Sequence, residues 1–319
     1  MIKIKKQRNL DTIIEDSFKF FKENVKELIK IIWTQNSLII LGLLISYFLY
    51  YYYYFGSFNQ MINFESGTAK MDFELMSVKF LLVFSAMLLF SFIFFPRFIA
   101  AVAAYMQLYD QNNGQVDPDA VKKFVNQKFW GLIALSLLLA ISLFILVFFI
   151  VLVAVGLVKL GSAGIFLIFA MVLPLILYLI VYLSLVYYVY IFENKGFIDT
   201  FKVTYHYLKH RFWFSFGVIF IMGLIVSLIG AVLNAPISIY IMIKTMGIIQ
   251  KSGTMTAVSA QSDMVVAFLG LLSFAAQLIL RILTVISMVF LYYSLREYHT
   301  GESLYEEIDQ IGRHEDNHN

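Results

Sequence analysis

The residue that most invites a chemical explanation is an arginine inside a long apolar run. Arg281 lies near the middle of the run 264–295, where a charge is costly in hydrocarbon and must face the helix bundle, water or a lipid headgroup. Gln277 lies one helical turn earlier on the same face, and Asn234 lies in the preceding run. These three residues are candidates for holding lipid or substrate. A structural tie between helices is the alternative for Arg281, and we favour it.

A second arginine occupies a comparable place. Arg97 follows Pro96 and stands thirteen residues before Asp110, much as Arg281 stands sixteen residues before Glu297. The shared placement indicates a basic lining at one end of the spans and makes Arg97 a further candidate for lipid or substrate binding. Extension of the side chain to the headgroups is the simpler interpretation, and we favour it.

Residue types that support catalysis or metal binding are scarce. His206 and His210 are one helical turn apart, but a catalytic zinc needs a third protein ligand and usually a nearby general base, and neither is evident. The chain contains no cysteine, which excludes disulfides, thiolate nucleophiles and cysteine metal sites. It also lacks a glycine-rich phosphate loop followed by a lysine. We therefore predict no catalytic residues, no metal, no cofactor and no enzymatic activity.

The composition places the chain in a bilayer. It has 319 residues, of which 61% are hydrophobic and 14% charged, well outside the range of soluble domains. A spanning helix needs about 20 mostly apolar residues. Six runs meet this requirement: 37–55, 78–107, 132–158, 165–192, 213–243 and 264–295. Pro96, Pro174 and Pro236 lie inside such runs and predict bends.

Lysine and arginine predict the orientation of the spans. Eighteen of them lie in the N-terminal segment, the second and fourth connections and the C-terminal tail, against five on the opposite side. Because positive charge favours the cytoplasmic side, both termini are expected there, including the tail 302–319.

Three basic segments have the pattern of amphipathic helices that lie on the membrane surface: 10–32, 117–129 and 193–213. The third carries Lys202, Lys209 and Arg211 between its apolar positions. The first has an apolar stripe made of Leu10, Ile13, Ile14, Phe18, Phe21, Val25, Leu28, Ile29 and Ile32. Their basic side chains are expected to contact anionic phospholipid headgroups.

Each of these segments leads into a pair of spans in a similar way. Trp33, Trp130 and Trp213, the three tryptophans of the chain, each follow a basic residue at the start of a spanning run and are expected at the membrane interface. Each pair of spans then ends in an acid followed closely by a glycine. The pattern predicts three pseudo-repeats, 1–114, 115–196 and 197–301. The alternative is that tryptophan and basic residues simply favour the interface.

The predicted fold is therefore an all-α integral membrane protein with six transmembrane helices in three hairpins, each preceded by a cytoplasmic amphipathic interfacial helix. Within the fifth span, small residues predict close packing between helices: Gly217, Gly223, Ser227 and Gly230.

The segment 185–233 resembles a known bacterial pattern. An aromatic-rich span ends in Glu193, Gly196 follows, and an amphipathic helix leads to a basic and aromatic re-entry at 211–213. This is similar to the membrane-domain family named after glycerophosphoryl diester phosphodiesterases. The resemblance implies a bacterial plasma (inner) membrane protein. It implies no phosphodiesterase activity, because that reaction belongs to a separate soluble barrel of about 250 residues, for which this chain has no room.

These features favour a non-enzymatic scaffold or accessory subunit that organises lipid or a membrane-protein partner at the cytoplasmic face. The alternative is a transporter or lipid-handling permease with a site between the repeats, near Arg97 and Arg281. The expected partners are the bilayer, anionic headgroups and a further membrane protein. No nucleic acid is expected.

Overall fold

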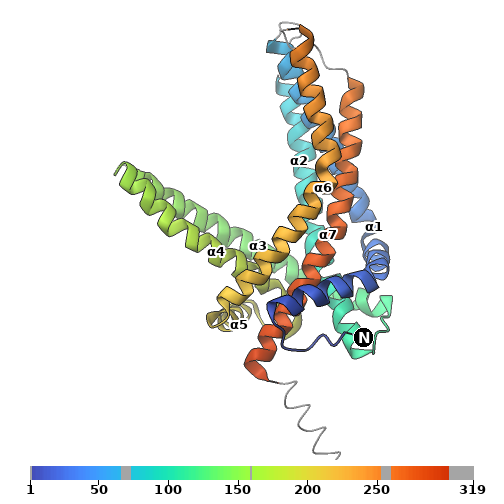
Figure 1. Ribbon diagram of the computed structural model, residues 1–319, viewed down its shortest axis with the longest axis vertical. Helices are drawn as coiled ribbons and strands as arrows, with labels where there is room; N and C mark the ends of the chain where they lie inside the picture. Colours follow the sequence, from blue (N-terminus) through green and yellow to red (C-terminus); the bar gives the residue numbers. More distant parts are fainter. Residues whose placement is uncertain (1, 66–72, 159, 253–259, 302–319) are drawn as a thin grey trace, which may run out of the picture. The chain divides into compact units, whose positions relative to one another are not determined.

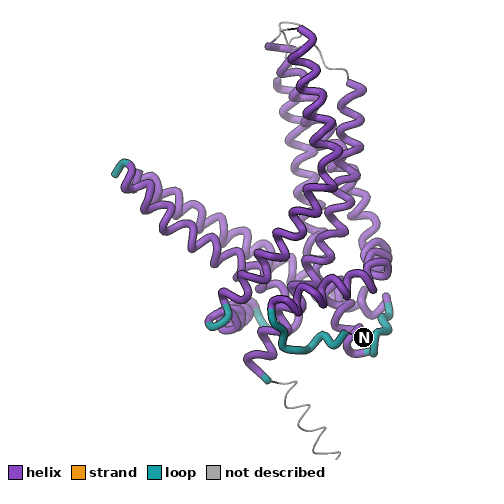
Figure 2. Tube along the Cα trace, viewed as in Figure 1, coloured by secondary structure: helices purple, strands orange, loops and turns teal. Residues whose placement is uncertain are grey.

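The computed structural model describes residues 2–65, 73–158, 160–252 and 260–301, and the side chains of 55–65, 73–77, 165, 244–252 and 260–263 lie outside that description. Within these limits the chain consists of helices joined by short loops, with no strand (Figure 2). The helices labelled in Figure 1 are α1 (Leu10–Glu65), α2 (Phe73–Gln111), α3 (Pro118–Val158), α4 (Ser162–Glu193), α5 (Phe197–Lys209), α6 (Phe212–Ser252) and α7 (Ala260–Thr300). The predicted tail 302–319 lies outside the described residues.

Six of these helices are long and apolar enough to cross a membrane, which confirms the predicted all-α, multi-pass class of fold. The stretches are Leu10–Tyr54, Val78–Gln111, Pro118–Val158, Ser162–Glu193, Phe212–Ile243 and Met264–Thr300. All six stretches are much longer than the about 20 residues that a spanning helix needs. The 39 residues of α2 measure about 59 Å if straight, against a hydrocarbon layer of about 30 Å.

The surplus length is explained by a change in burial along the helices. In α7 the apolar side chains of Met264, Phe268 and Leu272 are each 61% exposed, whereas Phe290 and Leu291 are fully buried. The other long helices change in the same way: α2 becomes buried from Phe94 onward, and α4 from Val181. One part of each run is therefore apolar because it can face lipid, and the other because it forms a protein core.

The chain forms two compact units. Unit 1 consists of Met1–Leu28, Phe98–Gly223 and Leu283–Asn319, and unit 2 of Ile29–Arg97 and Leu224–Ile282. Unit 1 holds the segments that precede the spans together with the buried ends of α2, α4 and α7. Unit 2 holds the remaining parts of α1, α2, α6 and α7.

The interruption within α1 was not predicted. Asn36 has φ −129° and ψ 17°, which are not helical values and divide α1 into two parts. The helices α2, α4 and α6 continue through Pro96, Pro174 and Pro236, and the bends predicted at these prolines stay a prediction.

The three basic segments join their spans in different ways. The first leads into the span through the break at Asn36, and the second is continuous with α3 from Pro118. The third is a helix of its own, α5, which is separated from α6 by a turn at His210 and Arg211.

The helices α2, α4 and α7 end in a similar way. Left-handed backbone follows each of them, at Gly114 (φ 93°), Asn194 (φ 52°) and Gly301 (φ 64°), which stops the helix. A buried tyrosine precedes each terminal acid by five residues: Tyr105 before Asp110, Tyr188 before Glu193 and Tyr292 before Glu297. This parallel is consistent with three pseudo-repeats, which stay a prediction.

Candidate functional site

A polar group that joins several helices of unit 1 is the carboxylate of Glu193, the last residue of α4. Its Oε1 accepts hydrogen bonds from the phenol of Tyr207 on α5, at 2.7 Å, and from the phenol of Tyr292 on α7, at 2.9 Å. Its Oε2 lies 3.3 Å from Lys195 Nζ. Three donors thus satisfy this carboxylate, and it joins three helices.

Aromatic and basic side chains extend this cluster. The ring of His299 stacks on Tyr207, with 5.5 Å between centroids, and lies 4.8 Å from the ring of His206. The guanidinium of Arg211 lies 3.8 Å above the ring of Tyr298. His206 therefore contacts another helix instead of serving one half of a metal site with His210.

The N-terminal segment is anchored to unit 1 through Arg8. The Arg8 side chain is 2% exposed, its Nε lies 2.8 Å from Asp16 Oδ2, and its Cζ lies 4.3 Å from the centroid of the Phe290 ring. The backbone N–H of Arg8 donates to Ser294 Oγ at 3.0 Å, and that hydroxyl donates to the carbonyl of Arg8 at 3.0 Å. Burial lowers the pKa of Arg8, and the opposing effect of Asp16 offsets this only in part.

The first basic segment packs on protein through a face that differs from the predicted apolar stripe. Its most buried positions on α1 are Ile13, Ser17, Phe20, Asn24 and Leu28, which recur at helical spacing. Phe18 and Phe21 of the predicted stripe are only half-buried. The face that packs on protein includes two polar residues, Ser17 and Asn24, which the stripe omits because of their type, and the expected contact of the stripe with the membrane stays a prediction.

A tyrosine of α2 explains why polar residues occur there. The phenol of Tyr105 donates hydrogen bonds to Asn24 Oδ1 at 3.0 Å and to Glu27 Oε2 at 2.7 Å. The backbone N–H of Ile4 donates to Asp110 Oδ1 at 2.9 Å, which attaches the N-terminal segment to the same end of α2. Polar groups in this core thus satisfy one another.

In unit 2, Arg97 contacts the break in α1. Its Nε donates to Asn36 Oδ1 at 2.8 Å, and Asn36 Nδ2 donates to the carbonyl of Ile32 at 3.1 Å. The neighbouring Gln35 has both amide atoms buried with no hydrogen-bond partner among the described residues. Arg97 therefore ties α2 to α1, in addition to any contact with headgroups.

Arg281 lies against an aromatic ring. Its Cζ lies 4.9 Å from the centroid of the Phe95 ring on α2, and its side chain is exposed. Two of the predicted candidates are in contact, since Gln277 Nε2 donates to Asn234 Oδ1 at 3.3 Å, a pairing that was not itself predicted.

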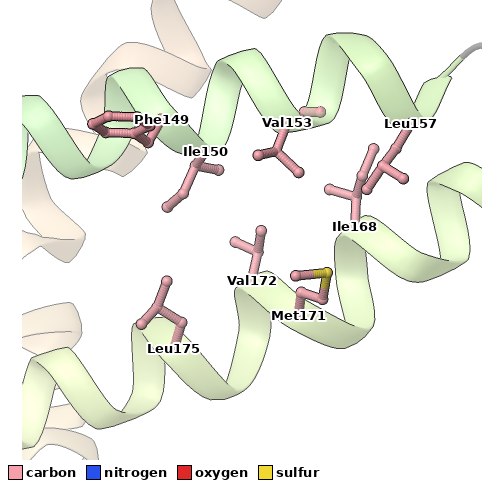
Figure 3. A pocket seen from close by; sticks show the side chains of 9 residues that line it. Phe149, Ile150, Val153, Leu157, Ile168, Met171, Val172 and Leu175 are labelled. Carbon is pink, nitrogen blue, oxygen red and sulfur yellow. The ribbon is translucent and has the colours of Figure 1, made fainter.

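A cavity between the far ends of α3 and α4 carries no chemistry. It has a volume of about 170 Å³, and its lining is entirely aliphatic or aromatic, apart from the thioether of Met171 (Figure 3). No hydrogen-bond donor or charge points into it from the labelled side chains. Such a space suits hydrocarbon and not a polar ligand.

Five of the six predicted interfacial residues are exposed, and the sixth, Arg211, is half-buried. Trp33, Trp130 and Trp213 are 48%, 75% and 76% exposed, although tryptophan is the largest apolar side chain. Lys202 and Lys209 on α5 are also exposed, and Lys202 Nζ lies 3.7 Å from Asp199 Oδ1. The fifth-span glycines differ from one another: Gly217 fits the predicted close packing, since a Cβ there would lie 3.0 Å from Leu10 Cδ1. Gly223 and Gly230 have no atom within 4 Å of a Cβ built on them, so close packing within the chain is wrong for both.

Three observations bear on the class of the protein. Among the described residues, no three side chains of histidine, aspartate or glutamate gather in a way that would hold a metal ion. No family model matches the chain, and neither a curated protein nor a solved structure matches it. The resemblance to the phosphodiesterase membrane family therefore stays a prediction.

Proposed function

We propose that the chain is a non-enzymatic membrane scaffold or accessory subunit, and that unit 1 organises anionic lipid or a membrane-protein partner at the cytoplasmic face. The observation that carries this proposal is the pairing of polar groups in the core of unit 1. Glu193 is bound by Tyr207 and Tyr292, and Arg8 by Asp16. Groups held in this way stabilise a scaffold and have no room for a substrate.

The surface of unit 1 supports a role in contacting a membrane or a partner. On α5, Ile198 and Tyr205 are 72% and 53% exposed, and exposed Lys202 lies between them in sequence. On the first basic segment, four lysines are exposed: Lys19, Lys22, Lys26 and Lys30, the last at the start of unit 2. Apolar side chains beside lysines suit the boundary between headgroups and acyl chains.

The location follows from the same charges. We propose that the basic ends face the cytoplasm and that the membrane is a bacterial plasma (inner) membrane. The excess of lysine and arginine on one side supports the first statement, and the family resemblance supports the second.

Photocrosslinking in native membranes tests the scaffold proposal. A benzophenone amino acid at Tyr205 is expected to capture a lipid or one partner of defined mass, because that side chain is exposed. The same probe at buried Thr204 is the control and is expected to capture only this chain. Crosslinks from Tyr205 that match those from Thr204 would contradict the proposal.

A transporter or lipid-handling permease is the second candidate, and the amide pair in unit 2 favours it. The contact of Gln277 with Asn234 places two polar side chains within apolar spans. Cysteine introduced at Asn234 tests this, because the chain has no other cysteine. An impermeant thiol reagent is applied from each side of the membrane in turn. Labelling of this cysteine from either side, with both labelling rates changed by addition of a ligand, would favour the permease. Protection from both sides would contradict it.

A further inference from the structure

The arginines of unit 2 mark the ends of two apolar stretches of equal length. On α2, seventeen uncharged residues separate Lys79 from Arg97, and on α7, seventeen separate Asp263 from Arg281. Eighteen helical steps measure about 27 Å, close to the thickness of the hydrocarbon layer of about 30 Å. Both arginines thus end a stretch that matches the hydrocarbon, at the depth where the lipid phosphates begin.

The structure brings these two levels together. The guanidinium of Arg281 lies 4.9 Å from the centroid of Phe95, which is two residues before Arg97 on α2. Arg97 itself is held by Asn36 at 2.8 Å. The ends of the two apolar stretches are therefore at the same level of unit 2, as the equal spacing requires.

Arg281 has donors of the right type beside it. Gln277 lies one turn away on the same face of α7 and uses one amide hydrogen to contact Asn234 Oδ1 at 3.3 Å. A primary amide carries two such hydrogens, so Gln277 and Asn234 add N–H donors near a guanidinium. Side chains from three helices of unit 2, α2, α6 and α7, thus meet at this position.

The missing component is an anion. The side chains of unit 2 that the structure describes include Arg97 and Arg281 but no carboxylate. An aromatic face stabilises a guanidinium by about 0.5–2 kcal/mol, far less than a paired anion in a medium of low dielectric constant. Arginine binds phosphate through two parallel hydrogen bonds, which makes a phosphate group the natural counter-ion.

We propose that Arg281, with the amides of Gln277 and Asn234, binds the phosphate of an anionic phospholipid headgroup. The exposed apolar side chains of the α7 stretch that precedes Arg281 favour a lipid over a free phosphate ion. Leu272 and Ile279 are 61% and 40% exposed and are available to acyl chains. The inference depends on the six-span fold and is independent of the scaffold proposal, which concerns the surface of unit 1.

Native mass spectrometry of the full chain tests this site. The purified protein is titrated with phosphatidylglycerol and, as a neutral reference, with phosphatidylcholine. The wild-type chain is expected to retain one phosphatidylglycerol molecule. Arg281→Gln is expected to bind this lipid about 10- to 100-fold more weakly, because a hydrogen bond to a charged group is lost. Arg281→Lys keeps the charge without the two parallel donors, so its affinity for phosphatidylglycerol is expected to lie between those of the wild type and Arg281→Gln.

The controls separate this site from general effects. Lys5→Gln removes an exposed charge that lies outside the three basic segments and is expected to leave the affinity unchanged. If Arg281→Gln does not fold, the comparison of Arg281→Lys and Gln277→Leu with the wild type decides the matter, and equal affinities in all three would overturn the proposal. Equal affinity of Arg281→Gln and the wild type would also overturn it. Displacement of the lipid by millimolar inorganic phosphate would overturn the assignment to lipid and indicate a site for the free ion.

Discussion

The phenol of Tyr292 donates a hydrogen bond of 2.9 Å to Glu193 Oε1, which joins α7 to the end of α4 across 99 positions of the sequence. Tyr292 is fully buried, and Glu193 lies at a helix end that Tyr207 also contacts. A carboxylate in such a place stays ionised at low cost only while its donors remain. The core of unit 1 depends on this contact.

Removal of the Tyr292 hydroxyl should therefore destabilise the protein. Tyr292→Phe keeps the ring and leaves Glu193 with one donor fewer, which is expected to cost about 1–3 kcal/mol. The measurement is the thermal or denaturant unfolding of the purified protein in detergent. Tyr298→Phe is the control, since its side chain is 44% exposed. Equal shifts for the two variants would contradict the role assigned to Tyr292.

Arg8 offers a second test in unit 1. Arg8→Ala removes a buried guanidinium that pairs with Asp16 at 2.8 Å and lies above Phe290. Loss of one partner of a buried pair costs about 3–5 kcal/mol, and less is expected here because the Asp16 side chain is 29% exposed. The unfolding midpoint and the rate of proteolysis at the N-terminus report the effect. Lys5→Ala, at an exposed position, should change neither.

The sequence predicts where the helices lie far better than it predicts whether lipid or protein surrounds each of their side chains. Hydropathy identifies all six spans, because length and apolar content decide whether a helix can cross a bilayer. It cannot separate Phe268, which is 61% exposed, from Phe290, which is buried. Both are apolar, and only the tertiary structure decides whether lipid or protein surrounds them.

The partners of the polar residues could not be predicted for a related reason. The apolar stripe predicted for the first basic segment omits Ser17 and Asn24, yet both are buried, since Ser17 bonds its own helix and Asn24 accepts from Tyr105. Arg281 was expected to face the helix bundle, water or a lipid headgroup, and the sequence did not reveal its contact with Phe95. Gln277 and Asn234 stood out as polar residues within spans, but only the structure shows that they pair.

The break in α1 gives a prediction for unit 2. Asn36→Ala removes the acceptor of the Arg97 Nε–H and the cap on the carbonyl of Ile32. A loss of about 1–3 kcal/mol is expected, because a half-buried charged donor loses one of its hydrogen-bond acceptors. Unfolding midpoints measure it. Thr34→Ala is the matched control, since Thr34 is exposed and its hydroxyl bonds the carbonyl of Lys30 in the same helix. A larger effect at Thr34 than at Asn36 would refute the tie between α1 and α2.

Two glycines of unit 2 allow a test of packing. A Cβ at Gly270 would lie 2.6 Å from Tyr51 Cδ2, so Gly270→Ala forces the ring to move and is expected to cost about 1–3 kcal/mol. A Cβ at Gly230 meets nothing within 4 Å, so Gly230→Ala should be neutral or stabilise the helix by up to about 1 kcal/mol. Unfolding of both variants provides the comparison. Destabilisation by Gly230→Ala alone would show that the packing in unit 2 is not as described.

The account depends on all three basic segments lying on the cytoplasmic side of one membrane. Single cysteines at Lys22, Lys123 and Lys202 test this directly, because all three positions are exposed and the chain has no other cysteine. A cysteine at Lys79, also exposed, marks the predicted opposite side. With an impermeant maleimide, the cysteine at Lys79 should react in intact cells and the other three only after permeabilisation. Labelling of any of those three in intact cells would contradict the account.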